Sequence, residues 1–195
     1  MRSIKAVFLE AILLALAGVL FALAANALSP RGLRIARNYF PGAPAAPVST
    51  TNVATATDSI AARLQQHGLK LATSNEVAQL FRDPAYEQGL IVFVDARNDH
   101  AYESGHVPGA WQLDRYRPEN YLPTVLPHCL TAQKVVVYCN GGSCEDSEFA
   151  AIMLREAGIP NDNILVYGGG ISEWTNAMPF EVGARASGQI IQPKP

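Results

Sequence analysis

The chain has 195 residues, enough for one domain with an appendage and too few for two full domains. Its formal net charge is −2, and its 15 basic residues are scattered apart from a small group after the first apolar segment, which excludes a basic nucleic-acid-binding surface. The three cysteines, Cys129, Cys139 and Cys144, are too few for a disulfide framework in a chain of this length.

A short tail, residues 1–5, precedes an almost wholly apolar segment, residues 6–28, which only Glu10, Gly18 and Asn26 interrupt. A helix of about 20 residues crosses a hydrocarbon core of about 30 Å, so we predict one membrane-spanning helix in contact with lipid. A cleaved signal peptide is an alternative, because small residues that suit cleavage lie near the end of the segment. A buried core helix is another. The length of the run and its interruption by Glu10 favour the anchor.

Basic residues flank both ends of this segment. Arg2 and Lys5 precede it, and Arg31, Arg34 and Arg37 follow it. Positive residues favour the cytoplasmic side of a membrane, and a free thiol is kept more easily there. The sequence therefore predicts a single-pass protein of the cell membrane. It leaves the side of the soluble part open, with a small preference for the cytoplasm.

Residues 29–67 are predicted to be a juxtamembrane segment and linker. From Pro41 to Thr57 the composition is rich in Pro, Ala, Ser and Thr without an apolar period, which is typical of an extended, semi-flexible linker. Within the same segment, Ser59–His67 is expected to form a short helix. A folded domain is predicted over residues 68–184, followed by a C-terminal tail over residues 185–195.

Short apolar runs alternate with helical segments across the predicted domain. Thr73 and Glu76 form a capping box that opens one helix. A second helix is expected from about Cys144 to Ala157, with Gly158 as its stop signal, and a third, short helix near Glu173. After a short apolar stretch at Leu69–Leu71, the predicted strands are Ile91–Val94, Ala110–Leu113, Lys134–Tyr138 and Ile164–Tyr167. Strands separated by helices imply a parallel sheet with helices on both faces, so the fold class is α/β.

The stretch from Val137 to Glu145 carries the predicted chemistry. Cys139 lies at the carboxyl end of the clearest strand, where parallel sheets bind ligands, and a helix starts just after it. Gly141 and Gly142 can adopt positive φ, so the loop can curl and direct its amide N–H groups inward. Such amides at a helix N-terminus hold an anion, here the Cys139 thiolate or a persulfide on it, and make the thiol nucleophilic without a separate base. The alternative is an inert, buried residue at a strand end.

Three motifs, in this order and spacing, resemble the signatures of the rhodanese family. The similarity runs from about Gly68 to Gly183. The motifs that carry it are Ile91–Arg97 with Tyr102–Ala110, Tyr138–Cys139 with its glycine loop and Leu154–Gly158, and Tyr167–Trp174. The resemblance implies an open parallel sheet of about five strands with helices on both faces. It also implies a catalytic cysteine that accepts sulfane sulfur as a persulfide and passes it to a thiophilic acceptor.

By this resemblance Cys139 is the catalytic residue of a membrane-anchored sulfurtransferase. Its partners would be a small sulfur donor and a thiol or protein acceptor; no cofactor, metal ion or nucleic acid is implied, and the oligomeric state is left open. Asp95 and Arg97, at the end of a strand, are expected to form buried polar contacts or to lie at the rim of the site. The active-site loop consists of Asn140, Gly141, Gly142, Ser143, Cys144 and Glu145.

The loop departs from the family pattern in its charge. The sixth position, counted from the cysteine, is often Arg, Ser or Thr, whereas here it is Cys144, followed by Glu145 and Asp146. Acidic residues in a first helical turn suit the helix dipole, but they oppose a thiolate or an anionic donor such as thiosulfate. Related phosphatases place an arginine one position later, where this chain has Glu145, which excludes phosphate-ester chemistry.

Cys144 has three interpretations. It packs at a helix start, or it resolves a persulfide or sulfenate on Cys139 into a disulfide, or it binds metal, for which two cysteines alone make a poor site. Two other functions therefore stay open: a thiol/disulfide redox switch of Cys139 and Cys144, and a non-catalytic interaction module. Cys129 is predicted to be an unreactive buried thiol.

Three further features are predicted to be structural. By the same resemblance His106, in Gly-His-Val-Pro-Gly, belongs to the structure of a turn and is not a general base. Trp174 is expected to pack against the sheet. The glycines at 168–170 lack the Gly-Lys-Ser/Thr sequence of a phosphate loop, so tight-turn geometry is the better explanation.

Overall fold

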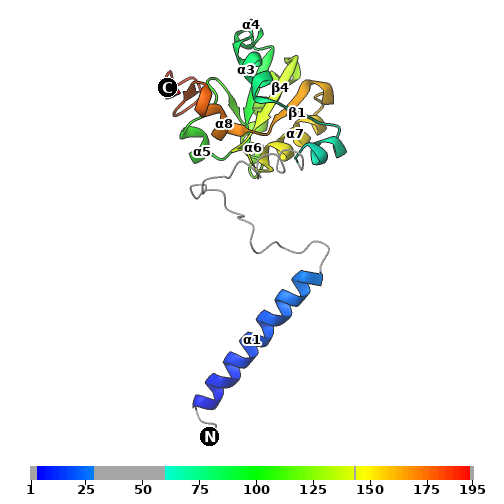
Figure 1. Cartoon of the computed structure of the whole chain (residues 1–195), viewed down its shortest axis with the longest axis vertical. Coiled ribbons are helices and arrows are strands. Elements are labelled where there is room, and N and C mark those ends of the chain that lie inside the picture. Colours follow the sequence, from blue (N-terminus) through cyan, green and yellow to red (C-terminus); the bar gives the residue numbers. More distant parts are fainter. Residues whose placement is uncertain (1–3, 29–59, 143, 194–195) are drawn as a thin grey trace. The chain divides into compact units, whose positions relative to one another are not determined.

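The computed structural model describes residues 4–28, 60–142 and 144–193 (Figure 1). The chain divides into two compact units, residues 1–41 and 42–195. The predicted linker and the basic residues before and after the apolar segment, apart from Lys5, lie outside the described residues. Each unit is therefore described by itself.

The first unit contains one uninterrupted helix, α1 (Ile4–Leu28), as predicted for residues 6–28. Its 25 residues correspond to a length of about 38 Å. Within it, Phe8–Asn26 is long and apolar enough to cross a membrane. Large apolar side chains such as Phe8, Leu14 and Phe21 are exposed all around the helix, so α1 has no polar face.

The second unit is built on a five-stranded sheet with strand order β1-β5-β4-β2-β3. All four strand pairs are parallel, which confirms the predicted α/β fold and the sheet of about five strands. The central strands are continuous runs of β-branched and aromatic residues, because both of their faces are covered. In chain order the strands are β1 (Lys70–Ala72), β2 (Ile91–Asp95), β3 (Trp111–Gln112), β4 (Lys134–Tyr138) and β5 (Ile164–Tyr167).

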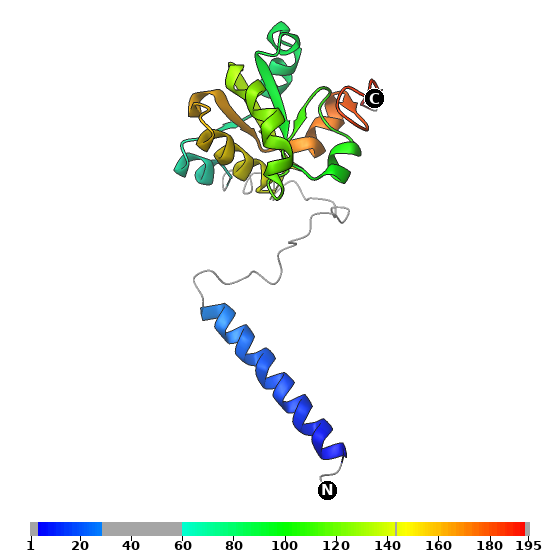
Figure 2. The same ribbon diagram turned by 180° about the vertical axis from the view of Figure 1, so that it is seen from behind.

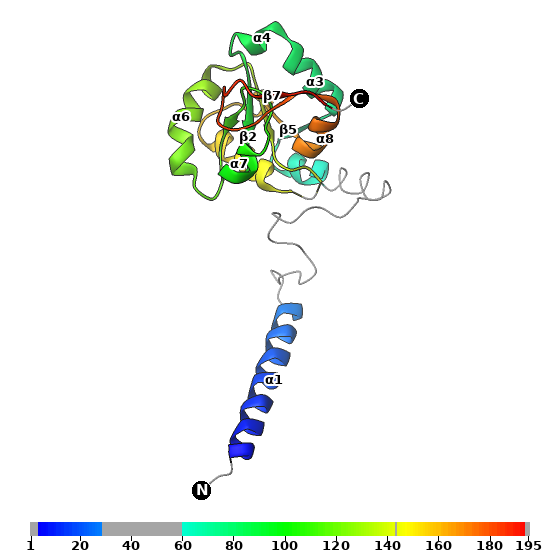
Figure 3. The same ribbon diagram turned by 90° about the vertical axis from the view of Figure 1, so that its left-hand side faces the viewer.

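Helices cover both faces of this sheet, so the unit has three layers (Figure 3). Alternate side chains of β4 point to opposite faces: Val135 and Val137 join one apolar cluster, and Val136 and Tyr138 join the other. The first cluster is covered by a helix over residues 60–66, α6 (Pro118–Thr131) and α7 (Asp146–Glu156); α6 and α7 lie in front of the sheet in Figure 2. The second is covered by α3 (Ser74–Arg82), α4 (Pro84–Glu87) and α8 (Gly170–Ala177).

The predicted helix starts are close to the observed ones. The Thr73 side chain accepts a hydrogen bond from the amide of Glu76 and caps α3, as the capping box indicates. Helix α7 begins at Asp146, two residues after the predicted start, and the chain leaves it through Gly158, whose φ is +106°. The short helix predicted near Glu173 is α8.

Several elements were not predicted from the sequence. They are α4, α5 (Asp99–Glu103), α6, the 3-10 helix η1 (Asn161–Asn163) and the antiparallel pair β6 (Phe180–Glu181) and β7 (Ile190–Ile191). Strand β7 lies in the segment expected to be a C-terminal tail. That segment therefore takes part in the fold, because its backbone pairs with β6.

Candidate active site

Cys139 follows β4 directly, at the carboxyl end of the middle strand of the sheet, and its side chain is buried. The carbonyl oxygen of Cys139 accepts a hydrogen bond from the amide of Ile171 at 2.9 Å, and that of Asn140 accepts one from Ser172 at 3.3 Å. The amide of Gly142 donates to the carbonyl of Gly168 at 3.2 Å. These bonds join the cysteine loop to the segment that follows β5.

The two segments approach each other so closely that only glycine fits at positions 141 and 170. Gly141 and Gly142 have φ of +97° and +63°, as predicted. A Cβ atom on Gly141 would overlap the carbonyl oxygen of Gly169, whereas one on Gly142 would meet nothing within 4 Å. Gly170 has φ of +59°, and a Cβ there would overlap the backbone of the cysteine loop. The glycine run at 168–170 therefore provides the predicted tight turn and, in addition, a close contact with the cysteine loop.

The sulfur of Cys139 has a hydroxyl partner that the sequence did not single out. The Oγ atom of Ser147, in the first turn of α7, donates to the Sγ atom of Cys139 over 3.4 Å, and both side chains are buried. A hydroxyl donor and the positive end of a helix dipole both favour an anionic sulfur at this position. The surroundings of Cys139 therefore favour its nucleophilic form.

Cys144 is joined to Cys139 by a disulfide, with the two Cα atoms 6.5 Å apart. The Sγ atom of Cys144 also lies 3.7 Å from Oδ2 of Asp146. Of the three interpretations of Cys144, this geometry favours a second thiol that pairs with Cys139. Within the described residues, no group of three or more His, Cys, Asp or Glu side chains is placed to hold a metal ion. Ser143, which was included in the predicted loop, lies outside the described residues.

Two arginines from other elements lie beside the cysteine loop, which itself contains no cation. Arg63, in the helix over residues 60–66, binds Glu148 at 2.9 Å, and its second nitrogen lies 3.9 Å from Glu145. Arg115, just after β3, binds Asp146 at 2.6 Å and stacks on the ring of Phe149.

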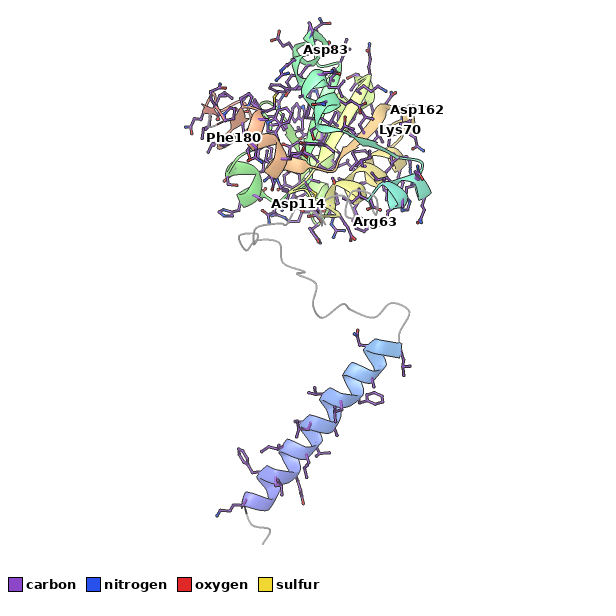
Figure 4. All side chains as sticks on the ribbon, viewed as in Figure 1. Arg63, Lys70, Asp83, Asp114, Asp162 and Phe180 are labelled. Atoms are coloured by element: carbon purple, nitrogen blue, oxygen red, sulfur yellow. A yellow bond between two sulfur atoms is a disulfide. The ribbon has the colours of Figure 1, made fainter. Side chains whose placement is uncertain are left out.

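In Figure 4, Arg63 and Asp114 lie at the end of the domain opposite Asp83. Arg115 follows Asp114 directly in the chain. Burial raises the pKa of Asp146, although Arg115 acts in the opposite direction. Each arginine is thus paired with a carboxylate. Sequence reasoning missed both, but the position of Arg115 after the end of a strand is a signal that could have identified it.

Asp95 and Arg97 form a buried ion pair and are not at an exposed rim. The Nε and Nη2 atoms of Arg97 donate to the two carboxylate oxygens of Asp95 at 2.9 and 2.6 Å, and Nη2 also donates to the carbonyl of Gly105 at 2.6 Å. Their exposed fractions are 0% and 5%. Of the two expectations for this pair, the structure therefore favours the buried polar contact that holds the segment after β2.

His106 is fully buried and has a structural role, as predicted. Its Nδ1 lies 3.0 Å from the carbonyl oxygen of Tyr102, and its Nε2 lies 3.3 Å from a carboxylate oxygen of Glu181. The main chains of His106 and Glu181 also exchange two hydrogen bonds of 2.8 Å. The histidine therefore ties the turn before β3 to β6.

Cys129 and Trp174 have the predicted structural roles. Burial raises the pKa of the Cys129 thiol to about 12, which makes it unreactive near neutral pH. Trp174 is buried in the apolar cluster under α8, and its Nε1 donates to the carbonyl of Pro179 at 2.7 Å.

Comparison with known proteins shows the family of this domain. The family model described as "Rhodanese-like domain" matches residues 73–177, more than half of the chain. A curated relative, tRNA uridine(34) hydroxylase of Buchnera aphidicola subsp. Schizaphis graminum, is 36% identical over 58 residues, which cover 28% of this chain and 19% of that protein. This chain therefore matches about one fifth of the length of that relative.

The chain is also similar to solved structures, at low sequence identity. Thiosulfate sulfurtransferase from Pseudomonas aeruginosa is 24% identical with a TM-score of 0.46, and the match covers 69% of this chain and 24% of that one. The BH2092 protein from Bacillus halodurans is 20% identical with a TM-score of 0.45, and the match covers 67% of this chain and 90% of that one.

Proposed function

The chain belongs to the rhodanese-like domain family, and on that premise we propose that it is a sulfurtransferase that carries sulfane sulfur on Cys139. The observation that supports this most is the place of the Cys139 sulfur, at the end of the middle strand, beside the hydroxyl of Ser147 and the first turn of α7. These groups favour a sulfur anion, whether the thiolate or the persulfide.

The transfer consists of two displacements at sulfur. The Cys139 thiolate attacks the outer sulfur of a donor R–S–S⁻, the S–S bond of the donor breaks, and the thiolate RS⁻ leaves. A thiolate acceptor then attacks the outer sulfur of the Cys139 persulfide, and the Cys139 thiolate is restored. No cofactor is required, because each step forms one bond to sulfur and breaks another.

The charges beside the loop favour a donor of low charge. Arg63 is paired with Glu148, and Arg115 with Asp146, so carboxylates accompany both cations. A doubly charged donor such as thiosulfate would meet these carboxylates, whereas an organic persulfide carries a single negative charge. We therefore propose a persulfide donor and a thiol or protein acceptor.

We also propose that α1 anchors the enzyme in the cell membrane as a single span. Its length, its apolar composition and the exposure of its large apolar side chains support this. The full chain should then resist extraction from vesicles by alkaline carbonate and yield to detergent. A mature protein that lacks residues 1–27 would instead indicate a cleaved signal peptide.

A second candidate function is a thiol/disulfide redox switch of Cys139 and Cys144, which the disulfide between them favours. This candidate predicts a disulfide that forms readily and little sulfur transfer. A non-catalytic interaction module predicts neither a disulfide that forms readily nor any sulfur transfer.

Intact mass of the full chain in detergent separates the three. The reduced protein is offered a small persulfide, and Cys144→Ser is used to prevent disulfide formation. A gain of one sulfur atom that disappears in the variant with both Cys139→Ser and Cys144→Ser supports the transferase. A loss of two hydrogens in the wild type, with no sulfur gained by Cys144→Ser, supports the redox switch. If the mass shows neither change, the interaction module is the remaining candidate.

A further inference from the structure

We infer that Cys144 resolves the persulfide on Cys139, so that the domain releases the bound sulfur as hydrogen sulfide and finishes as the Cys139–Cys144 disulfide. This inference rests on the proposed function, because it requires a persulfide on Cys139. It adds a second reaction to the same site: reduction of sulfane sulfur to sulfide, in addition to its transfer.

The loop geometry already joins the two sulfur atoms. The Cα atoms of Cys139 and Cys144 are 6.5 Å apart, within the range that disulfides span without movement of the backbone. The loop is held by the bond from the Ile171 amide to the Cys139 carbonyl and by the bond from the Cys144 amide to the Gly141 carbonyl, at 2.9 and 3.3 Å. A thiol on Cys144 is therefore an intramolecular nucleophile whose effective concentration exceeds that of a free acceptor thiol.

The surroundings give the two thiols different roles. The Cys139 sulfur lies beside a hydroxyl donor, whereas the Cys144 sulfur lies 3.7 Å from Oδ2 of Asp146. The other oxygen of this carboxylate is held by Nε of Arg115 at 2.6 Å, which fixes its orientation. A carboxylate beside a thiol disfavours the thiolate until it accepts the thiol proton. Cys139 is thus the first nucleophile, and Cys144, with Asp146 as its general base, is the second.

The reaction needs no external oxidant. The Cys144 thiol gives its proton to Asp146, and its sulfur attacks the Sγ atom of Cys139. The bond from that Sγ to the outer sulfur of the persulfide anion breaks, and the outer sulfur takes up the proton from Asp146 and leaves as HS⁻. The two cysteine sulfurs are oxidised to the disulfide, and the sulfane sulfur is reduced to sulfide, so the electrons balance.

Further turnover requires a dithiol reductant. Cys144 is half-buried and Cys139 is buried, so the reductant reaches the sulfur of Cys144. Attack there releases Cys139 as the thiolate, next to Ser147, and the second thiol of the reductant then frees Cys144.

The test uses the full chain in detergent, reduced, freed of reductant and given one equivalent of cysteine persulfide. Sulfide is trapped with monobromobimane, and intact mass is taken at the same times. We expect the wild type to release about one sulfide per chain and to lose two hydrogens. Cys144→Ser should keep the added sulfur and release no sulfide above the background of Cys139→Ser.

The failures of the two proposals give different results. A wild type that keeps the added sulfur and releases no sulfide overturns the inference and leaves the transferase standing. A Cys144→Ser variant that gains no sulfur overturns the transferase, and the inference with it. Dithiothreitol should support many turnovers of sulfide release in the wild type; turnover by Cys144→Ser at the same rate would also overturn the inference.

The role of Asp146 as a general base has its own readout. Asp146→Asn should slow sulfide release about tenfold and change its dependence on pH, because the acceptor of the Cys144 proton is lost. Glu156→Gln, which changes an exposed carboxylate at the end of the same helix, is the matched control. Equal rates and equal pH profiles for the two variants would remove Asp146 from the mechanism.

Discussion

The hydroxyl of Ser147 lies 3.4 Å from the sulfur of Cys139, and both side chains are buried although they belong to α7 and to the end of β4. Hydrogen bonds to charged groups contribute roughly 1.5–3 kcal/mol. With Cys144 replaced by serine, Ser147→Ala should therefore slow alkylation of Cys139 by iodoacetamide near neutral pH by about tenfold or more. Mass spectrometry over time gives the rate.

The control for this prediction is Ser104→Ala. The Ser104 hydroxyl is exposed and donates to the Ala101 carbonyl, so its loss leaves the surroundings of Cys139 unchanged. If both variants react as fast as the parent, the hydroxyl does not stabilise the thiolate.

The contact between the two glycine segments predicts unequal effects at neighbouring positions. Gly142→Ala should reduce the free energy of unfolding by about 1–2 kcal/mol, because only its positive φ is strained. Gly141→Ala carries the same strain and also an overlap with Gly169, so its loss should be larger by about 1–3 kcal/mol. Urea unfolding of both variants measures the difference, and equal losses would contradict the close approach.

The contacts of Glu181 predict an acid-sensitive contribution to stability. Burial raises its pKa, but the amides of Gly109 and Gly188, together with His106, outweigh burial and hold the pKa below its usual value of 4.5. The stabilisation is therefore complete above pH 4.5 and is lost as the pH falls through the lower pKa of the folded state.

Glu181→Gln tests this contribution. At pH 7 the free energy of unfolding of the variant should be lower than that of the wild type by about 1–3 kcal/mol, so the variant unfolds at a lower temperature. This difference in stability should narrow as the pH falls below 4.5. Thermal unfolding followed by circular dichroism at several pH values measures it. Glu87→Gln, on an exposed position of α4, should show no such gap; a gap for Glu181→Gln that is constant with pH would contradict the assignment.

The raised pKa of Cys129 predicts which thiols react in the folded protein. After reduction at pH 7, iodoacetamide should modify Cys139 and Cys144 and leave Cys129 unmodified, because burial raises the pKa of the Cys129 thiol to about 12, whereas Ser147 and the start of α7 favour the thiolate of Cys139. In urea all three should react. Peptide mapping identifies the modified residues. Modification of Cys129 in the folded protein as fast as that of Cys139 and Cys144 would show that α6 opens readily.

Local signals explain why much of the fold could be predicted from the sequence. β4 is a continuous β-branched run, Thr73 caps α3 through a contact three residues away, and positive φ at Gly141 is a property of glycine itself. Helix α6 was missed because Pro123 and Pro127 interrupt its pattern, and each removes a helical hydrogen bond. That helix is stabilised by tertiary packing, since its side chains Val125 and Cys129 are buried in the core.

The candidate site was predicted only as far as its own loop. Cys139 and its glycines are consecutive in the sequence, so their proximity is given by the chain. Ser147 is one helical turn further on, and its orientation toward the sulfur depends on where α7 starts. Arg63 and Arg115 reach the loop from other elements. The position of Arg115 after a strand is a signal for it, but no local pattern in the sequence relates Arg63 to the loop.

The contact of Gly141 with Gly169 and Gly170 also limits how the loop can be re-engineered. A loop grafted from a relative, with a longer turn or an added cation, must fit against the segment after β5 as well as against α7. Transplanting the six residues alone should therefore yield a misfolded or poorly soluble chimera, whereas a graft that also carries residues 168–172 should fold. The loop can thus be exchanged together with the segment after β5 and not by itself.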